Sequence, residues 1–204
     1  NRWVALGRAQ YAAARKGDDK SAQYAADAKA TFTEAVKKWP GEKVLWAFLS
    51  ELTDFTKDTA GGEALLKQMM ARPEFKDNPE PTMMLADHYL RQQKEAQAEA
   101  TMKKAIETFP RSVDPKRRLA AYYTQKKRYP EALALLQGDS SDKLVGQQIV
   151  QIYMLSGKFG EAEKLVRSLI ATNEKEAQFH AMLGVVLLNE NQEQQAQEAL
   201  NTAL

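Results

Sequence analysis

Apolar residues recur along this chain at the spacing of helices. In the segment PTMMLADHYLRQQKEAQAEATMKKAIETFP (81–110), Leu85 and Tyr89 fall on one face of a first helix. Ala98 and Met102 fall on one face of a second helix, and a proline ends the segment. Because no stretch alternates apolar and polar residues in the manner of a strand, we expect an all-α fold without a sheet.

The same helix pair is repeated along the chain. Its marker is an alanine in the second helix, followed in most copies by a larger apolar residue four positions later. The alanines are Ala28, Ala64, Ala98, Ala132, Ala162 and Ala196, at spacings of 36, 34, 34, 30 and 34 residues. So regular a period predicts tandem units. Their expected ranges are 1–40, 41–78, 79–112, 113–142, 143–176 and 177–204.

These units resemble the tetratricopeptide repeat (TPR) family, whose 34-residue pattern is W-x₂-L-G-x₂-Y…A-x₃-F…P. The first unit carries Trp3, Leu6, Gly7, Ala28, Phe32 and Pro40. It departs from the pattern by extra length near Lys16–Tyr24, and the second unit has Gln68 in the aromatic position. A further departure is a short turn at Gly138–Lys143. The resemblance implies an α-solenoid of antiparallel hairpins in a right-handed superhelix, with a concave groove lined by the first helix of each pair.

Residue size gives this pattern a physical basis. Small residues such as Gly7 and Gly184 would let the two helices of a hairpin approach closely, as would Ala86 and Ala120. Large residues would fill the space between hairpins, among them Tyr89, Tyr123 and Tyr153. Helices should stop or start at Pro40, Pro110 and Pro130. We also expect turns at Gly61–Gly62 and Ser156–Gly157.

Composition narrows the class of protein. Charged residues make up 27% of the 204 residues and hydrophobic ones 44%, which is typical of a folded domain. The net charge of +2 argues against bulk attraction to nucleic acid or membrane. The chain has no cysteine and no apolar run of membrane-spanning length. It starts at Asn1 and lacks a polar closing helix, so we interpret it as a piece of a longer protein. Its composition, rich in Ala, Gln and Lys, suggests a bacterial protein of the periplasm, cell envelope or cytoplasm.

No combination of residues indicates catalysis. The two histidines, His88 and His180, have no cysteine or second histidine nearby, so we expect no metal site. His180 stands where the repeat pattern has Trp, and packing between helices explains it. The chain contains no G-x-S-x-G sequence and no phosphate-binding glycine loop. We therefore expect a non-enzymatic protein without cofactors.

The resemblance implies which residues line the groove. Projection onto the family's groove positions selects Arg8, Tyr11, Glu51, Asp54, Met83, Asp87, Leu90, Arg91, Arg117, Ala121, Thr124, Gln147, Gln151, Met154, Val185 and Asn189. Met83 and Leu90 would be apolar anchors, and charged neighbours would set orientation. The position that holds Asn in relatives that grip a chaperone's terminal carboxylate carries other residues here, which disfavours that role. We expect a scaffold that binds a protein or peptide segment, possible settings being a bacterial envelope or secretion assembly.

Two alternatives remain open. A basic stretch could bind an anionic ligand or polyanion, through Arg111, Lys116, Arg117, Arg118, Lys126, Lys127 and Arg128. Its cations are confined to one repeat and are not interleaved with free aromatic residues, so nucleic acid is not the expected partner. Alternatively, the chain could be a spacer or a homo-oligomerisation unit that uses an apolar C-terminal end at Ala199, Leu200 and Leu204.

Overall fold

The computed structural model describes residues 2–204, and every regular element in this range is a helix. The α-helices are α1 (Arg2–Ala14), α2 (Ser21–Lys38), α3 (Lys43–Phe55), α4 (Thr59–Met70), α5 (Glu80–Arg91), α6 (Glu95–Thr108), α7 (Asp114–Gln125), α8 (Tyr129–Leu136), α9 (Lys143–Leu155), α10 (Phe159–Thr172), α11 (Ala177–Asn189) and α12 (Glu193–Thr202). Two 3-10 helices, η1 (Pro73–Phe75) and η2 (Gln137–Asp139), follow α4 and α8. One helix pair lies in each expected repeat range, so the all-α prediction is confirmed.

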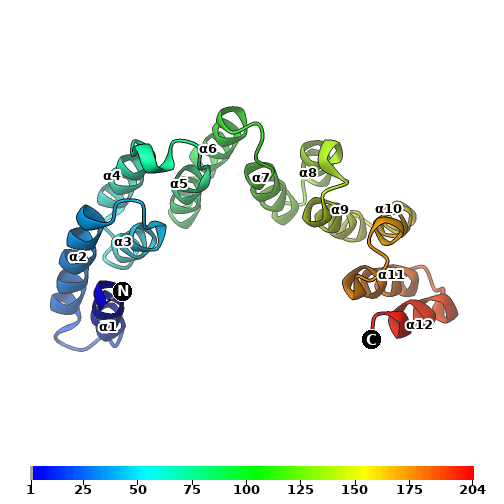
Figure 1. Cartoon of the computed structure of the whole chain (residues 1–204), viewed down its shortest axis with the longest axis horizontal. Coiled ribbons are helices and arrows are strands. Elements are labelled where there is room, and N and C mark those ends of the chain that lie inside the picture. The colour runs from blue at the N-terminus through cyan, green and yellow to red at the C-terminus, as the bar shows by residue number, and fades with distance from the viewer. Residues whose placement is uncertain (1) are drawn as a thin grey trace. The chain divides into compact units, whose positions relative to one another are not determined.

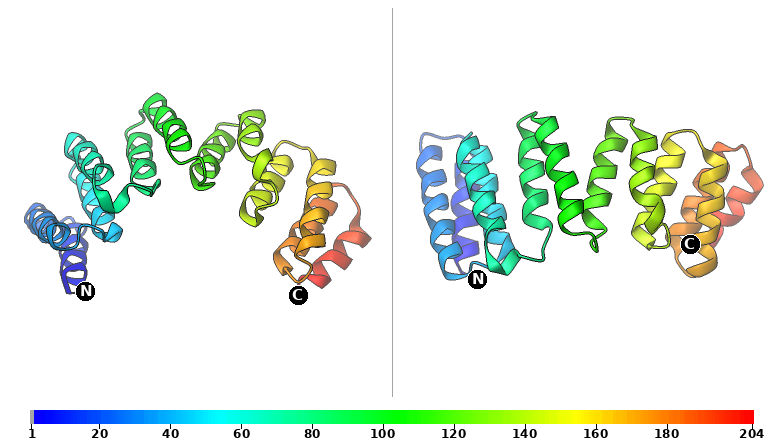
Figure 2. Two further views of the ribbon diagram at one scale, coloured as in Figure 1. Left: turned by 45° about the horizontal axis from the view of Figure 1, so that its top comes forward. Right: turned by 90° about the horizontal axis from the view of Figure 1, so that it is seen from above.

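The chain divides into two compact units, one ending at Pro110 and the other spanning Arg111–Leu204. In the N-terminal unit the first helices of the pairs, α1, α3 and α5, lie along one side, and the second helices, α2, α4 and α6, along the other (Figure 1). The C-terminal unit repeats this order, with α7, α9 and α11 as first helices and α8, α10 and α12 as second helices. Within each hairpin the two helices run antiparallel (Figure 2). Each unit is therefore two layers of helices.

Small residues let the helices of a hairpin approach closely, as the sequence predicted. A Cβ atom on Gly7 would lie 2.5 Å from the Phe32 ring, and one on Gly184 would lie 2.5 Å from Leu200 Cγ. Such separations are well inside van der Waals contact, so only glycine fits. Leu200 packs inside its own hairpin and Ala199 is buried, whereas Leu204 is fully exposed, so only part of the open apolar end that the sequence suggested is present.

The second hairpin has a different register from the predicted one. Ala64, the expected contact residue, is exposed, whereas Gly62 and Leu66 are buried. Gly62 and Leu66 are therefore the small residue and the larger residue four positions on, which removes the apparent anomaly at Gln68. The prediction of a turn at Gly61–Gly62 was also wrong. Both glycines lie in the first turns of α4, where the Asp58 side chain accepts a hydrogen bond from the Gly61 N–H at 2.9 Å.

Five of the hairpin turns share one backbone feature. The first and second helices are joined through a residue in the left-handed region, at Lys57, Gln93, Lys127, Gly157 and Asn191, with φ between 57° and 73°. These residues are 36, 34, 30 and 34 residues apart, which matches the repeat spacing. In the first hairpin Gly17 adopts the same left-handed conformation, with φ 75°, inside a longer connection over residues 15–20, where the sequence indicated extra length. The turn, not only the apolar face, is thus a repeated unit of the fold.

Each unit has its own apolar core. In the N-terminal unit, Phe32, Trp46 and Leu52 are buried, and the Trp46 Nε1–H donates to the Pro40 carbonyl at 2.8 Å. In the C-terminal unit, Val166 and Phe179 are fully buried between α10 and α11. None of the helices in residues 2–204 is both long and apolar enough to cross a membrane.

Candidate functional site

Exposed apolar side chains gather on the first helices. Nine large apolar residues in the described chain are well exposed, and seven of these lie on first helices. The seven are Leu6, Val44, Phe55, Leu144, Leu155, Val185 and Leu188. The other two, Trp39 and Leu204, lie outside the helices, and no second helix contributes one. The first helices therefore provide most of the apolar surface that a partner could cover.

In the N-terminal unit, an aromatic pair and acidic groups meet on α1 and α3. The ring centroids of Tyr11 and Phe55 are 5.7 Å apart in an edge-to-face arrangement. Burial, and then the negative charge of Glu51, raise the pKa of the Tyr11 hydroxyl, with a smaller contribution from Asp54. These effects place the predicted groove residues Tyr11, Glu51 and Asp54 in one neighbourhood. Arg8 lies beside it, with its Cζ 5.8 Å from the centre of the Phe48 ring.

Asp54 also links the second hairpin to the third. Its carboxylate lies 2.6 Å from Arg91 Nε and 3.0 Å from Nδ1 of the fully buried His88. The other ring nitrogen of His88 lies 3.1 Å from the carbonyl oxygen of Thr59 at the start of α4. His88 thus joins α5 to both α3 and α4, and much of the hydrogen-bonding capacity of Asp54 is engaged inside the protein.

Met83 does not line a groove, so its selection as an apolar anchor was wrong. Its side chain is 1% exposed. Helix α5 is buried over most of its circumference, and Met83 lies one turn before the fully buried Ala86. The other residues predicted on α5 are more accessible: Asp87 and Leu90 are half-buried, and Arg91 is exposed.

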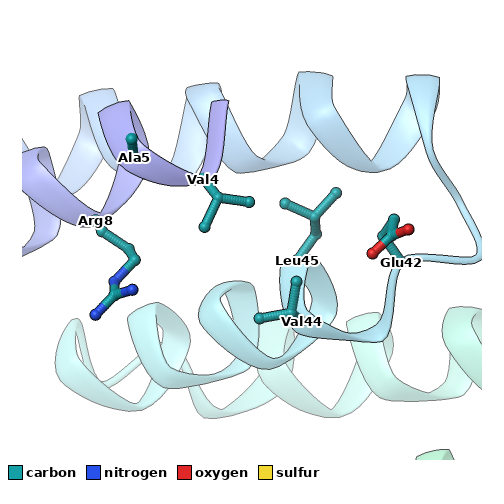
Figure 3. Close-up of a pocket in the computed structure, with 6 residues that line it drawn as sticks. All are labelled: Val4, Ala5, Arg8, Glu42, Val44 and Leu45. Atoms are coloured by element: carbon teal, nitrogen blue, oxygen red, sulfur yellow. The ribbon is translucent and has the colours of Figure 1, made fainter. Parts of the chain in front are cut away.

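A hollow of about 350 Å³ opens between α1 and the start of α3. Val4, Ala5, Val44 and Leu45 supply its apolar lining, with Arg8 and Glu42 completing it (Figure 3). In the close-up, Val4 and Leu45 lie between the two charged side chains. The hollow can take an apolar side chain and has one cationic and one anionic group at its margins. Of its lining, only Arg8 was predicted from the sequence.

In the C-terminal unit, the predicted residues fall on the exposed faces of α7, α9 and α11. Gln151 and Asn189 are exposed, and Thr124, Gln147 and Met154 are half-buried. Arg117 is also half-buried, and Gln148 Nε2 donates to its carbonyl oxygen at 2.8 Å. That bond ties the start of α7 to α9. Ala121 and Val185 are exposed as well.

The predicted basic stretch is not one patch. Lys116 and Arg117 lie near the start of α7, whereas Lys126–Arg128 follows its last residue, and a 12-residue helix is about 18 Å long. Several of the cations are also paired within the protein. Lys116 Nζ lies 2.6 Å from Asp139 Oδ2, and Arg128 Nε lies 3.0 Å from Glu131 Oε1. Arg118 has an internal interaction too, while Arg111 and Lys127 are exposed. The cations are therefore poorly arranged for joint contact with a polyanion.

The projection missed three well-exposed apolar residues of the candidate surface, Phe55, Leu155 and Leu188. Leu188 lies three residues after Val185, and Leu155 lies four after Gln151, so both share a face with predicted positions. The sequence did contain a signal for them. An apolar residue on this face is not needed for the buried stripe of its helix, so it is a candidate for contact with a partner.

The described residues contain no group of three or more His, Cys, Asp or Glu that could hold a metal ion. His180 is half-buried, and its Nε2 lies 2.8 Å from the carbonyl oxygen of Glu174. The neighbouring Phe179, rather than His180, is the fully buried residue of this turn of α11.

Comparisons with known proteins agree with this architecture. Residues 83–142 match the tetratricopeptide repeat family. A search of curated proteins finds no relative. Among solved structures, the C-terminal part of a TPR repeat-containing protein from Cytophaga hutchinsonii has a TM-score of 0.63 at 10% identity, over 88% of this chain and 72% of that one. MamA from Desulfovibrio magneticus RS-1 has a TM-score of 0.55 at 16% identity, over 78% and 91% of the two chains.

A third structure is YrrB, described as a TPR protein with an unusual peptide-binding site. It has a TM-score of 0.52 at 15% identity, over 84% of this chain and 90% of YrrB. At such low identities these likenesses concern the fold. Residues 83–142 therefore carry the tetratricopeptide repeat by sequence, and most of the chain shares the fold of tetratricopeptide-repeat structures.

Proposed function

We propose that this protein is a non-enzymatic interaction scaffold that binds a peptide segment of a partner protein on the exposed faces of its first helices. The observation that carries the proposal is the distribution of exposed apolar residues: seven of the nine lie on first helices and none on a second helix. TPR folds are generally interaction modules, and YrrB is described as having a peptide-binding site, which supports the same interpretation. Such a module would suit a bacterial envelope or secretion assembly.

Polyanion binding is a weaker candidate. Its cations lie at both ends of α7, and Lys116 and Arg128 are paired with acidic side chains. Binding through them would first have to break these ion pairs. Affinity for a polyanion such as heparin that falls steeply with salt would favour this candidate over the scaffold.

Selection from a displayed random peptide library gives the test, because it works before the natural partner has been identified. Peptides selected on the intact chain are measured by fluorescence anisotropy against a double variant, Leu155→Glu with Leu188→Glu. In this variant the peptide would cover two glutamate charges instead of two leucine side chains, so its affinity should fall at least about 10-fold. The matched control, Gln194→Glu with Gln197→Glu, adds the same charge on the exposed part of α12 and should leave binding unchanged.

The control also separates the alternatives. Equal loss in both double variants would mean that charge alone, not the first-helix surface, governs binding. If library selection yields no peptide and light scattering shows mass that rises with protein concentration, homo-oligomerisation would replace the scaffold proposal.

A further inference from the structure

The C-terminal unit carries two features on one surface that point to a particular kind of partner segment. The first is a lack of charge. Helices α9 and α11 contain 13 residues each, and Lys143 is the only Lys, Arg, Asp or Glu among them. Lys143 forms an ion pair with Glu176. The exposed face of these two helices is therefore made of neutral side chains.

Apolar side chains dominate one end of this face. Leu155 and Leu188 are about half exposed, and Val185 is 42% exposed. Met154 is partly exposed beside them. Because α9 and α11 occupy equivalent positions in successive hairpins, residues 34 apart, such as 154 and 188, lie at the same level along the two helices. The four residues therefore form one apolar area towards the C-terminal ends of α9 and α11.

The second feature is a pair of unused hydrogen-bond donors at the other end of the face. Arg117 Nε and Gln147 Nε2 are shielded from solvent and have no hydrogen-bond partner in the described part of the chain. The two residues are 30 apart, the repeat spacing at this point, so they occupy the same position on α7 and α9. The bond from Gln148 Nε2 to the Arg117 carbonyl holds the two helices together there.

Shielded donors without an acceptor are unfavourable, and an oxygen supplied by a partner would relieve both. The local charge favours an anionic oxygen. Arg117 itself is the cation at this position, since the neighbouring Lys116 and Lys143 are paired with Asp139 and Glu176. Asp114 Oδ1 forms an ion pair with Arg117 Nη1 at 3.6 Å, which is longer than a hydrogen bond, so the guanidinium keeps donors for a second carboxylate. The side chains of Arg117 and Gln147 are both partly exposed, so rotation of either side chain would bring its donor to the surface.

We infer that this face binds a peptide segment in which an acidic side chain lies close to two or more apolar side chains. The carboxylate accepts hydrogen bonds from Arg117 and Gln147, and the apolar side chains cover Met154, Leu155, Val185 and Leu188. The inference rests on the proposed function, and it assigns the C-terminal unit a ligand chemistry distinct from that of α1 and α3, where Glu51 disfavours an acidic segment.

Peptides selected from a displayed 12-residue random library provide the probe. Asp or Glu near Leu, Ile, Val or Phe should be enriched. One such peptide and its amide analogue, with Asp→Asn or Glu→Gln, are then measured by fluorescence anisotropy against intact wild type, Arg117→Met and Gln147→Met. Arg117→Met should lower the affinity for the acidic peptide at least about 10-fold and the affinity for the amide peptide by far less. Gln147→Met should act in the same direction.

Arg111→Gln serves as the matched control, since it removes one exposed cation of the same unit and should change both affinities equally and slightly. Circular dichroism establishes that each variant is folded; if Arg117→Met is not, Gln147→Met carries the comparison. The inference would be overturned if these variants lowered the affinities for the acidic and amide peptides by the same factor, or lowered neither. Peptides without acidic residues that bind at Phe55 and Val44 would also overturn it, while leaving the proposed function intact. Failure to select any peptide would instead count against the proposed function.

Discussion

At the scale of single residues, the contact between Gly62 and His88 explains a glycine inside a helix. A Cβ on Gly62 would lie 2.5 Å from His88 Cε1 and 2.7 Å from Thr53 Oγ1. His88 cannot retreat easily, because its ring nitrogens lie near Asp54 and Thr59. Gly62→Ala should therefore lower the free energy of unfolding by about 1–3 kcal/mol, although alanine is normally the better helix former by about 1 kcal/mol.

Urea unfolding followed by circular dichroism measures this change. Gly41→Ala is the control, because the nearest atom to a Cβ there is 3.7 Å away. A Gly62→Ala protein as stable as wild type would show that His88 is free to move, and the proposed role of His88 in joining three helices would be wrong.

Asp58 ties stability to pH at the start of α4. The hydrogen bond from the Gly61 N–H, and then that from Lys29, lower the pKa of Asp58 below its ordinary value of 3.8. Because the folded-state pKa is the lower one, its contribution is complete above the ordinary value and is lost as the pH falls below it. Asp58→Asn keeps a capping side chain but does not titrate. Wild type should be the more stable at pH 6, with the two converging in acid; parallel stability curves in acid would contradict this.

At the scale of elements, the hairpin turns offer a second prediction. Gln93 and Lys127 adopt positive φ, which non-glycine residues rarely do. Glycine at either position should raise the free energy of unfolding by roughly 0.5–1 kcal/mol, since it adopts this backbone without steric cost. Gly157→Ala is the reciprocal change and should lower it by a similar amount. Opposite signs in thermal unfolding would show that side-chain contacts, not backbone conformation, govern these turns.

The helix pairs could be predicted from the sequence because their signals are local. Ala98 and Ala132 stand at helical spacing from larger apolar residues, and Pro40 and Pro110 mark helix ends. The register of α4 could not, because Ala64 fits the alanine spacing whereas Gly62 becomes the contact residue only when His88 packs over it. Burial of Met83 likewise depends on how much of α5 its neighbours cover, which a projection of one helix does not contain.

At the scale of the whole molecule, the proposed function depends on which helices of each unit keep exposed apolar side chains. Packing of the second helices leaves them a charged outer surface, as in α10 with Glu161, Glu163, Lys164 and Arg167. The first helices keep exposed residues such as Phe55 and Leu188, whose cost in water is lowered only when a partner covers them. The sequence predicted that the first helices form the binding surface. Which of their residues are exposed could be known only from the burial seen in the structure.

The most direct test of the scaffold is a methyl NMR titration of the intact protein with a library-selected peptide. The methyl groups of Met154, Leu155, Val185 and Leu188 on first helices are compared with those of Ala134, Leu165 and Ile170 on second helices. We predict that saturating peptide shifts first-helix signals and leaves second-helix signals in place. Shifts concentrated on second helices would contradict the proposal that the first helices form the binding surface.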